Sequence, residues 1–317
     1  VIETSGVLVL PAFSLGRTQD VLFDLHWIVA ENPERYGAVT FYLDAPSARS
    51  MHQCMFDAFS RTETNGKNGK VRPMWLGKQM FRWLDLDDTD PADVQRMLDI
   101  ISITLNVPRE VDPSLVGAGS TVAQAWRPIL SPVGKRRELM ESGVPRPCVI
   151  VTGAGSCDGG PARAWLPHLL GDASTIVAML GYAPPTSIAG QLLSLRATPL
   201  AERARHTGCL AWSPDERVAI RDIRAAVVQL GGYSAHADQA GLVDWLIWEF
   251  KGEWKSSGRV VFVQHGADDQ RSALKDAFES RAAERGLPVR TVLPDSGEQW
   301  FDLDAGARVV DDRTSEV

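Results

Sequence analysis

The chain has 317 residues, of which 44% are hydrophobic and 23% charged, and its formal net charge is −7. This composition is typical of one large or two smaller globular domains, and it excludes disordered, collagen-like and coiled-coil proteins. Because basic residues are not in excess, the chain is not expected to be a protein that coats nucleic acid non-specifically, so any contact with nucleic acid must be local. The four scattered cysteines form no CxxC pair, which favours a reducing compartment, here the cytoplasm. No apolar run is long enough to span a bilayer, so no membrane association is expected.

The N-terminal residues Val1–Gly6 contain neither an initiator methionine nor a signal-like segment, and a predicted strand follows at once. We therefore expect that this sequence begins inside a longer protein.

Predicted strands and helices alternate in the first part of the chain. The continuous apolar run Val7–Phe13 is typical of a strand buried on both faces, and helical periodicity follows over Asp20–Glu31. Val39–Leu43 predicts a second buried strand, and the next helix is expected from Ser47, as N-cap, to about Phe59. This order predicts a parallel sheet flanked by helices, an α/β fold.

The pattern is less regular over residues 61–146. A polar stretch rich in Gly and Asn predicts a loop at its start. An apolar cluster follows and is interpreted as part of a core: Trp75, Met80, Phe81, Trp83 and Leu84. The acidic run Asp85–Asp93 and the basic triplet Lys135–Arg137 are interpreted as solvated surface.

Regular alternation returns after residue 146. The predicted strands are Pro147–Thr152, Ser174–Leu180, Val218–Leu230 (one strand or a hairpin arm), Arg259–Val263, and a last pair, Val289–Leu293 with Gln299–Leu303. Helices are predicted from Gly160 to Leu170 and over Ser187–Leu195, Gln239–Phe250 and Gln270–Arg285.

A glycine-rich loop follows the strand that ends at Thr152. It resembles a dinucleotide-binding loop, but Asp158 stands where the third glycine is needed, and no acidic residue ends the next strand to bind a ribose. A tight turn, or a loop whose backbone approaches a phosphate, is therefore favoured. The residues of this candidate phosphate or substrate loop are Gly153, Gly155, Ser156, Gly159 and Gly160.

Two histidines lie at the carboxyl ends of predicted strands. His236 directly precedes a predicted helix, and Asp238 is expected either to cap that helix or to orient the imidazole. His265 follows the predicted strand Arg259–Val263. Because catalytic groups gather at the carboxyl ends of strands in α/β sheets, this pair suits a metal ligand and a proton donor. The other histidines are interpreted as ordinary: His26, His52, His168 and His206.

The motifs occur in an order that resembles the β-CASP branch of the metallo-β-lactamase fold. This family of zinc-dependent nucleases includes RNase J and the endonuclease of pre-mRNA 3′-end processing. The matching stretches are Val7–Gln19 with its Gly-Arg-x-Gln, Phe41–Pro46, the loop Gly153–Gly160, Gly181–Tyr182, Gly232–Asp238 (motif B) and Val263–Gly266 (motif C).

The resemblance implies a fold, a chemistry and roles for both histidines. Residues 1–215 would form the β-CASP domain, with an insertion at about 61–146, and residues 216–317 the C-terminal part of a metallo-β-lactamase αββα sandwich. His236 would donate a proton to the leaving-group oxygen during RNA phosphodiester hydrolysis, and His265 would bind one of two zinc ions. The substrate would be RNA or another phosphodiester.

The sequence also departs from the family pattern. It contains no His-x-His-x-Asp-His, so the remaining zinc ligands are expected N-terminal to Val1, and the chain alone is expected to be inactive. Its expected partner is an N-terminal metallo-β-lactamase half, or further copies of itself. The alternative is a non-catalytic scaffold or nucleic-acid-recognition subunit of the same fold, so whether this chain takes part in catalysis stays open. A nucleotide-binding module built on the glycine loop is the third reading.

Overall fold

The computed structural model describes residues 3–64, 71–107, 120–131, 134–233, 237–249, 259–264, 266–294, 300–302 and 307–309. The chain divides into two compact units, Val1–Ser234 and Ala235–Val317. This division falls later than the boundary expected after residue 215, because strand β10 (Ala226–Gln229) pairs with the sheet of the first unit.

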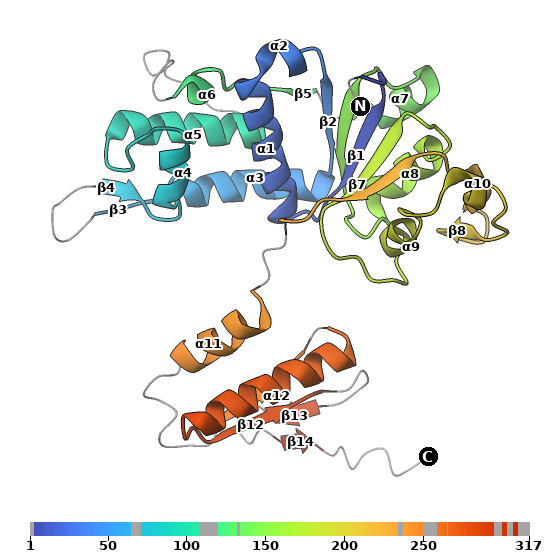
Figure 1. Ribbon diagram of the computed structural model, residues 1–317. Coiled ribbons are helices and arrows are strands. Elements are labelled where there is room, and N and C mark those ends of the chain that lie inside the picture. Colours follow the sequence, from blue (N-terminus) through green and yellow to red (C-terminus); the bar gives the residue numbers. More distant parts are fainter. Residues whose placement is uncertain are drawn as a thin grey trace. The chain divides into compact units, whose positions relative to one another are not determined.

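The first unit is built on a six-stranded sheet in the order β10-β7-β1-β6-β2-β5 (Figure 1). Every neighbouring pair in this sheet is parallel. Its central strands are the continuous apolar runs that the sequence predicted, because a strand covered on both faces has no polar side to show. The strands are β1 (Val7–Pro11), β2 (Thr40–Asp44), β5 (Leu130–Ser131), β6 (Cys148–Thr152), β7 (Thr175–Met179) and β10.

Helices cover both faces of this sheet. Successive side chains of β6 point to opposite faces and pack against different helices. Val149 and Val151 pack against α1 (Arg17–Glu31) and α3 (Pro46–Phe59). Cys148 and Ile150 point to the opposite face, which is covered by α7 (Arg136–Ser142), α8 (Gly160–Leu169) and α9 (Ile188–Ser194) (Figure 1). The short helices α2 (Pro33–Tyr36) and α10 (Leu200–Arg203) complete this part. The predicted α/β class, a parallel sheet flanked by helices, is confirmed.

Much of the segment 61–146 forms an additional layer outside α1 and α3. Its longest helix, α5 (Pro91–Leu105), contacts both of them and is capped by Asp90, whose carboxylate accepts a hydrogen bond from the backbone N–H of Ala92. The other elements of the layer are β3 (Thr62–Thr64), β4 (Val71–Pro73), α4 (Lys78–Trp83) and α6 (Thr121–Gln124).

Two local predictions were wrong. Ser47 does not cap α3: the helix begins one residue earlier, at Pro46, and the cap position is Ala45, whose side chain can accept no hydrogen bond. The stretch Val218–Leu230 is divided between two sheets. Its first part belongs to β9 (Arg217–Ala219), which forms a hairpin with β8 (Cys209–Ala211), and a 3₁₀ turn (Ile220–Asp222) separates this hairpin from β10.

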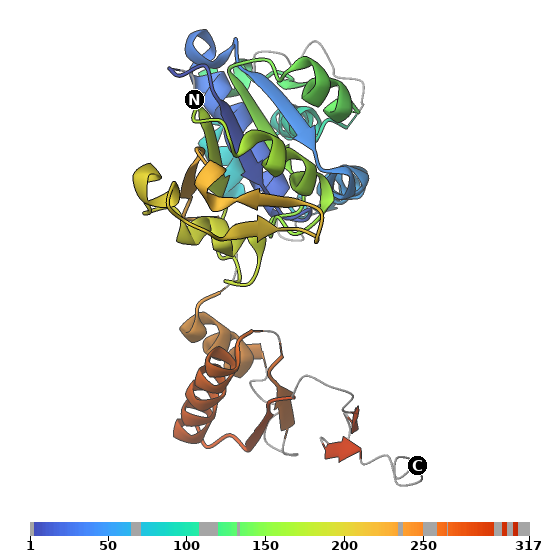
Figure 2. The same ribbon diagram turned by 90° about the vertical axis from the view of Figure 1, so that its right-hand side faces the viewer.

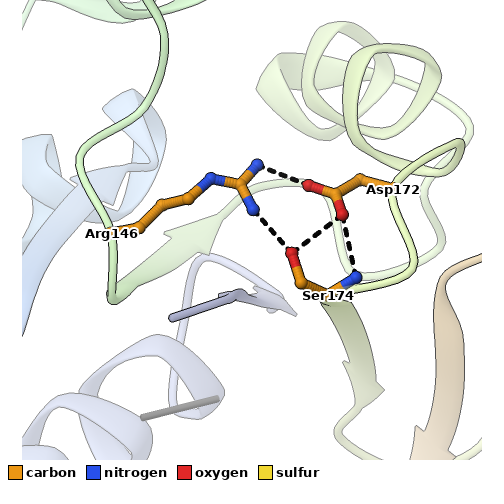
Figure 3. A network of polar contacts seen from close by, with 3 residues as sticks. All are labelled: Arg146, Asp172 and Ser174. Carbon is orange, nitrogen blue, oxygen red and sulfur yellow. Dashed lines mark hydrogen bonds and ion pairs between the residues drawn. The ribbon is translucent and has the colours of Figure 1, made fainter. Parts of the chain in front are cut away.

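A polar network joins the segments that enter β6 and β7 (Figure 3). The Arg146 guanidinium donates to the Ser174 hydroxyl at 2.6 Å and forms an ion pair with Asp172. Asp172 also accepts hydrogen bonds at 2.8 Å from the backbone N–H and the hydroxyl of Ser174. Burial alone would raise the pKa of Asp172, but these hydrogen bonds and the charge of Arg146 outweigh it and leave the pKa below its ordinary value. The network thus joins the amino ends of β6 and β7, the two strands that flank β1 in the sheet.

The second unit contains two helices that pack together, orange to red in Figure 2. These are α11 (Gln239–Glu249) and α12 (Asp268–Glu284), and their core includes Val243, Ile247 and Phe278. The strands are β11 (Arg259–Phe262), β12 (Val289–Val292), β13 (Trp300–Asp302) and β14 (Ala307–Val309). Both strands of the predicted last pair are present, as β12 and β13, but they do not pair with each other: β12 pairs in parallel with β11, and β13 pairs with β14. Within the described ranges no helix is both long and apolar enough to cross a membrane.

Candidate functional site

The motifs of the first unit gather at the carboxyl edge of its sheet. Because the six strands run parallel, the segments that follow them all leave from this edge. They are Phe13–Gly16 after β1, Asp44 at the end of β2, Gly153–Gly160 after β6, Gly181–Tyr182 after β7 and Gly231–Tyr233 after β10. The first three are in direct contact: the Gly153 N–H donates to the Asp44 carbonyl at 3.3 Å, and Gly155 lies against Phe13.

Two glycines of the loop are required by its shape. A Cβ added to Gly155 would lie 2.9 Å from the ring of Phe13. Gly160 has φ +61°, and a Cβ there would lie 2.8 Å from the carbonyl oxygen of Gly153. By contrast, nothing lies within 4 Å of a Cβ placed on Gly159. The sequence therefore predicted a tight loop correctly.

Within the loop, Cys157 is buried and Asp158 holds the loop against α9. Burial, and to a smaller extent the negative charge of Asp158, raises the pKa of the Cys157 thiol to about 12. This thiol is therefore neither a nucleophile nor a ready metal ligand at neutral pH. The Asp158 carboxylate accepts a hydrogen bond at 2.8 Å from the backbone N–H of Ile188, in the first turn of α9. The next N–H, that of Ala189, donates to the Ser156 carbonyl at 2.9 Å.

Asp44 connects the end of β2 to the helices beyond it. Its carboxylate accepts hydrogen bonds from Trp165 Nε1 at 2.9 Å and Arg136 Nη1 at 3.2 Å. Arg136 lines two cavities of about 450 and 550 Å³, and Arg163, paired with Glu216 at 2.6 Å, lines the smaller one. Arg136 belongs to the basic triplet interpreted as solvated surface. Sequence reasoning missed its role because the partner, Asp44, is distant in the chain.

Tyr233, the second residue of the predicted motif B, ties this segment to α1. Its hydroxyl donates to the Asp24 carboxylate at 2.6 Å. Burial and this hydrogen bond raise the pKa of Tyr233 well above its usual range, so the phenol stays protonated and keeps donating at neutral pH.

Asp238 makes the hydrogen bond of a helix cap. Its carboxylate accepts from the backbone N–H of Gly241 at 2.7 Å, in the first turn of α11. The alternative, that Asp238 orients the imidazole of His236, stays a prediction, because His236 lies outside the described residues. His265 also lies outside the described residues, so its role as a zinc ligand stays a prediction.

The remaining histidines include two that belong to the core. Burial lowers the pKa of His26 to about 4, and its Nδ1 lies 2.7 Å from the Leu22 carbonyl oxygen. Burial also lowers the pKa of His52, whose Nδ1 lies 2.7 Å from the Leu105 carbonyl oxygen. Both rings are therefore neutral at pH 7. His168 is exposed on α8.

The described residues do not by themselves fit a zinc site. They contain no group of three or more His, Cys, Asp or Glu side chains that could hold a metal ion. A protein zinc site needs about three or four such ligands. His265, which the motif order predicts as a ligand, would supply one of them.

Architecture and site together define an α/β protein whose motif-bearing loops lie at the carboxyl edge of a parallel sheet, followed in the chain by a smaller α/β unit. Residues 18–192 match the family model described as the Beta-Casp domain, and residues 220–293 match the Zn-dependent metallo-hydrolase RNA specificity domain. The chain belongs to the β-CASP family. The first match includes the segment 61–146, whose interpretation as an insertion stays a prediction.

A curated relative is similar over most of this chain. Ribonuclease TTHA0252 from Thermus thermophilus is 33% identical over 290 residues, which cover 90% of this chain and 49% of the relative. The chain thus spans about half the length of the curated relative it matches.

Proposed function

We propose that this chain is part of a zinc-dependent RNA phosphodiesterase, a ribonuclease. The observation that carries the proposal is that both predicted site histidines, the proton donor His236 and the zinc ligand His265, fall within the 220–293 match to the RNA specificity domain. The name of the Thermus thermophilus relative, a ribonuclease, supports the same substrate class.

Each histidine has one task in this proposal. His265 binds one of two zinc ions, and His236 donates a proton to the oxygen that leaves when the phosphodiester breaks. Zinc, when bound, stabilises negative charge on the phosphate and lowers the pKa of the attacking water. Asp238 directly precedes α11 and follows His236 by two residues, so its capping hydrogen bond from the Gly241 N–H fixes the backbone next to the proposed proton donor.

The glycine loop is proposed to receive a phosphate of the substrate. Gly160 opens α8, whose amino end carries partial positive charge, and lines the same cavity as Arg136 and Arg163. The open space around Gly159 allows a ligand to approach the backbone there. The residues proposed for this contact are Gly153, Gly155, Ser156, Gly159 and Gly160.

The remaining metal ligands are proposed to come from an N-terminal metallo-β-lactamase half that carries His-x-His-x-Asp-His, or from a second copy of the protein. A cytoplasmic location is proposed with it, which the free thiols of the four cysteines support.

The metal assignment is tested on the complex formed by co-expression with such an N-terminal half. Zinc is counted by elemental analysis in the wild type, in His265→Ala, and in His168→Ala as a control that removes an exposed histidine. We expect two zinc ions in the wild type and the control, and fewer in His265→Ala. An unchanged zinc content in His265→Ala would show that this residue is not a ligand. If the wild-type complex binds RNA but neither holds zinc nor cleaves, the recognition-subunit alternative is correct instead.

A further inference from the structure

A cavity of about 580 Å³ lies between α1, α4 and α5, away from the glycine loop. Two tryptophan side chains line it: Trp75, which precedes α4, and Trp83, the last residue of α4. Each of these side chains is 60% exposed. Nothing in the roles proposed above uses this cavity.

The sequence predicted that these tryptophans belong to a core, and for both of them this was wrong. Their neighbours Leu76, Phe81 and Leu84 are buried and hold α4 against the rest of the layer. With the segment anchored in this way, the two indoles face the cavity and stay accessible. Large exposed aromatic surfaces beside a cavity are typical of binding sites, because covering them with a ligand is favourable.

Among the described residues, the charged side chains that line the cavity are both carboxylates. Asp20 and Asp24 line it, and none of the described lining residues is Lys or Arg. Arg17 pairs with Asp20 at 3.0 Å, and Tyr233 donates to Asp24, so both carboxylates are partly compensated. Such a cavity disfavours a phosphate group inside it. It suits a flat, uncharged ligand that has an aromatic face and N–H groups at its edge.

We propose that this cavity binds a nucleobase of single-stranded RNA, stacked on Trp75 or Trp83 with its N–H edge toward Asp20 and Asp24. The inference rests on the proposed function. It is supported by the chain order, since Tyr233 in the cavity wall precedes His236 by three residues. Adenine and cytosine carry an exocyclic amino group that can donate two hydrogen bonds, whereas uracil has a single N–H donor and carbonyl acceptors. The carboxylates therefore favour A and C over U.

The test measures binding of fluorescein-labelled 12-nucleotide oligo(A) and oligo(U) to the full chain by fluorescence anisotropy. Trp75→Ala and Trp83→Ala are compared with Trp245→Ala, an indole in α11 that is also exposed, at 57%. We expect at least one of the two cavity variants to bind oligo(A) about 5- to 100-fold more weakly, the effect of losing one stacked base, and the control to bind within twofold of the wild type. The wild type should also bind oligo(A) more tightly than oligo(U), and this preference should be lost when the stacking indole is removed.

Two further measurements keep the result interpretable. Thermal unfolding of each variant shows that its fold is intact, and the more conservative Trp83→Phe should retain most of the affinity because it keeps a stacking face. Ultraviolet crosslinking of oligo(A) should yield modified peptides that contain Trp75 or Trp83.

The outcomes distinguish failure of the base site alone from failure of RNA binding as a whole. If all variants bind oligo(A) as the wild type does, RNA binding stands and the base site is wrong. If the wild type binds neither RNA, both proposals fail for this chain. If instead an octa-arginine peptide binds and only the cavity variants lose it, the cavity accepts a basic protein segment by cation–π contact, and the base assignment is overturned.

Discussion

Gly160, the first residue of α8, provides a sharp test of the geometry of the glycine loop. Its φ of +61° is a conformation that L side chains rarely adopt, and a Cβ would lie 2.8 Å from the Gly153 carbonyl oxygen. Its neighbour Gly159 is a matched control, because its φ is −151° and nothing lies within 4 Å of an added Cβ. Gly160→Ala and Gly159→Ala are therefore the same chemical change at adjacent positions.

The expected cost follows from two effects at Gly160. Holding alanine in the left-handed region costs about 1–2 kcal/mol. Relieving the contact with the Gly153 carbonyl requires a backbone shift, for which overpacking data suggest about 1–3 kcal/mol. Together these predict a loss of about 2–5 kcal/mol in the free energy of unfolding for Gly160→Ala. For Gly159→Ala we expect a change of less than about 1 kcal/mol.

The comparison is made by urea unfolding followed by far-UV circular dichroism, with thermal melting as a second measurement. At about 2–4 °C for each kcal/mol in a unit of this size, Gly160→Ala should melt roughly 5–15 °C below the wild type. Equal losses in the two variants, or a larger loss in Gly159→Ala, would refute the described path of the loop.

Three further predictions concern the packing around the sheet. Arg146→Met should cost about 0.5–1 kcal/mol at pH 7, because its partners are about a third exposed. Because the pKa of Asp172 is lowered, this contribution is present above about pH 4 and is lost as the pH falls through the folded-state pKa, so the urea midpoints of variant and wild type should converge progressively as the pH is lowered below about 4. Burial raises the pKa of both Cys148 and Cys157 to about 12, so a thiol reagent at pH 8 should modify two of the four cysteines in the native protein and all four in urea. Trp165→Phe removes a buried hydrogen bond to the carboxylate that ends β2, and should cost about 2 kcal/mol in urea unfolding.

The fold was largely predictable because its central strands are unambiguous in the sequence. A run such as Cys148–Thr152 is apolar throughout, and only a strand or helix buried on all sides has that pattern. The tight loop predicted after this strand, with glycines at 153, 155 and 160, agrees with the structure. Capping was less predictable: Ser47 is a good capping residue by type, but Pro46 already occupies the first turn of the helix.

The site was only partly predictable, since several of its contacts join residues far apart in the chain. Asp158 stands where a dinucleotide-binding loop needs its third glycine, and its structural role is a hydrogen bond from the N–H of Ile188, a residue distant in the chain. Trp75 and Trp83 were interpreted as core because hydrophobicity does not distinguish a side chain that faces a core from one that faces a cavity. The metal site depends on His265 and on ligands that the described residues do not provide.

The central claim is that this chain contributes the proton donor to a ribonuclease, and the cleavage of RNA tests it most directly. The complex with the N-terminal metal-binding half is incubated with a labelled single-stranded RNA, and the products are followed for the wild type, His236→Ala and His168→Ala. We predict that His236→Ala retains the zinc of the wild type and loses at least 100-fold in rate, at the lower end of the usual contribution of general acid catalysis, about 10²- to 10⁴-fold. His168→Ala should cleave at the wild-type rate. Cleavage by His236→Ala at the wild-type rate, with zinc bound, would contradict the account.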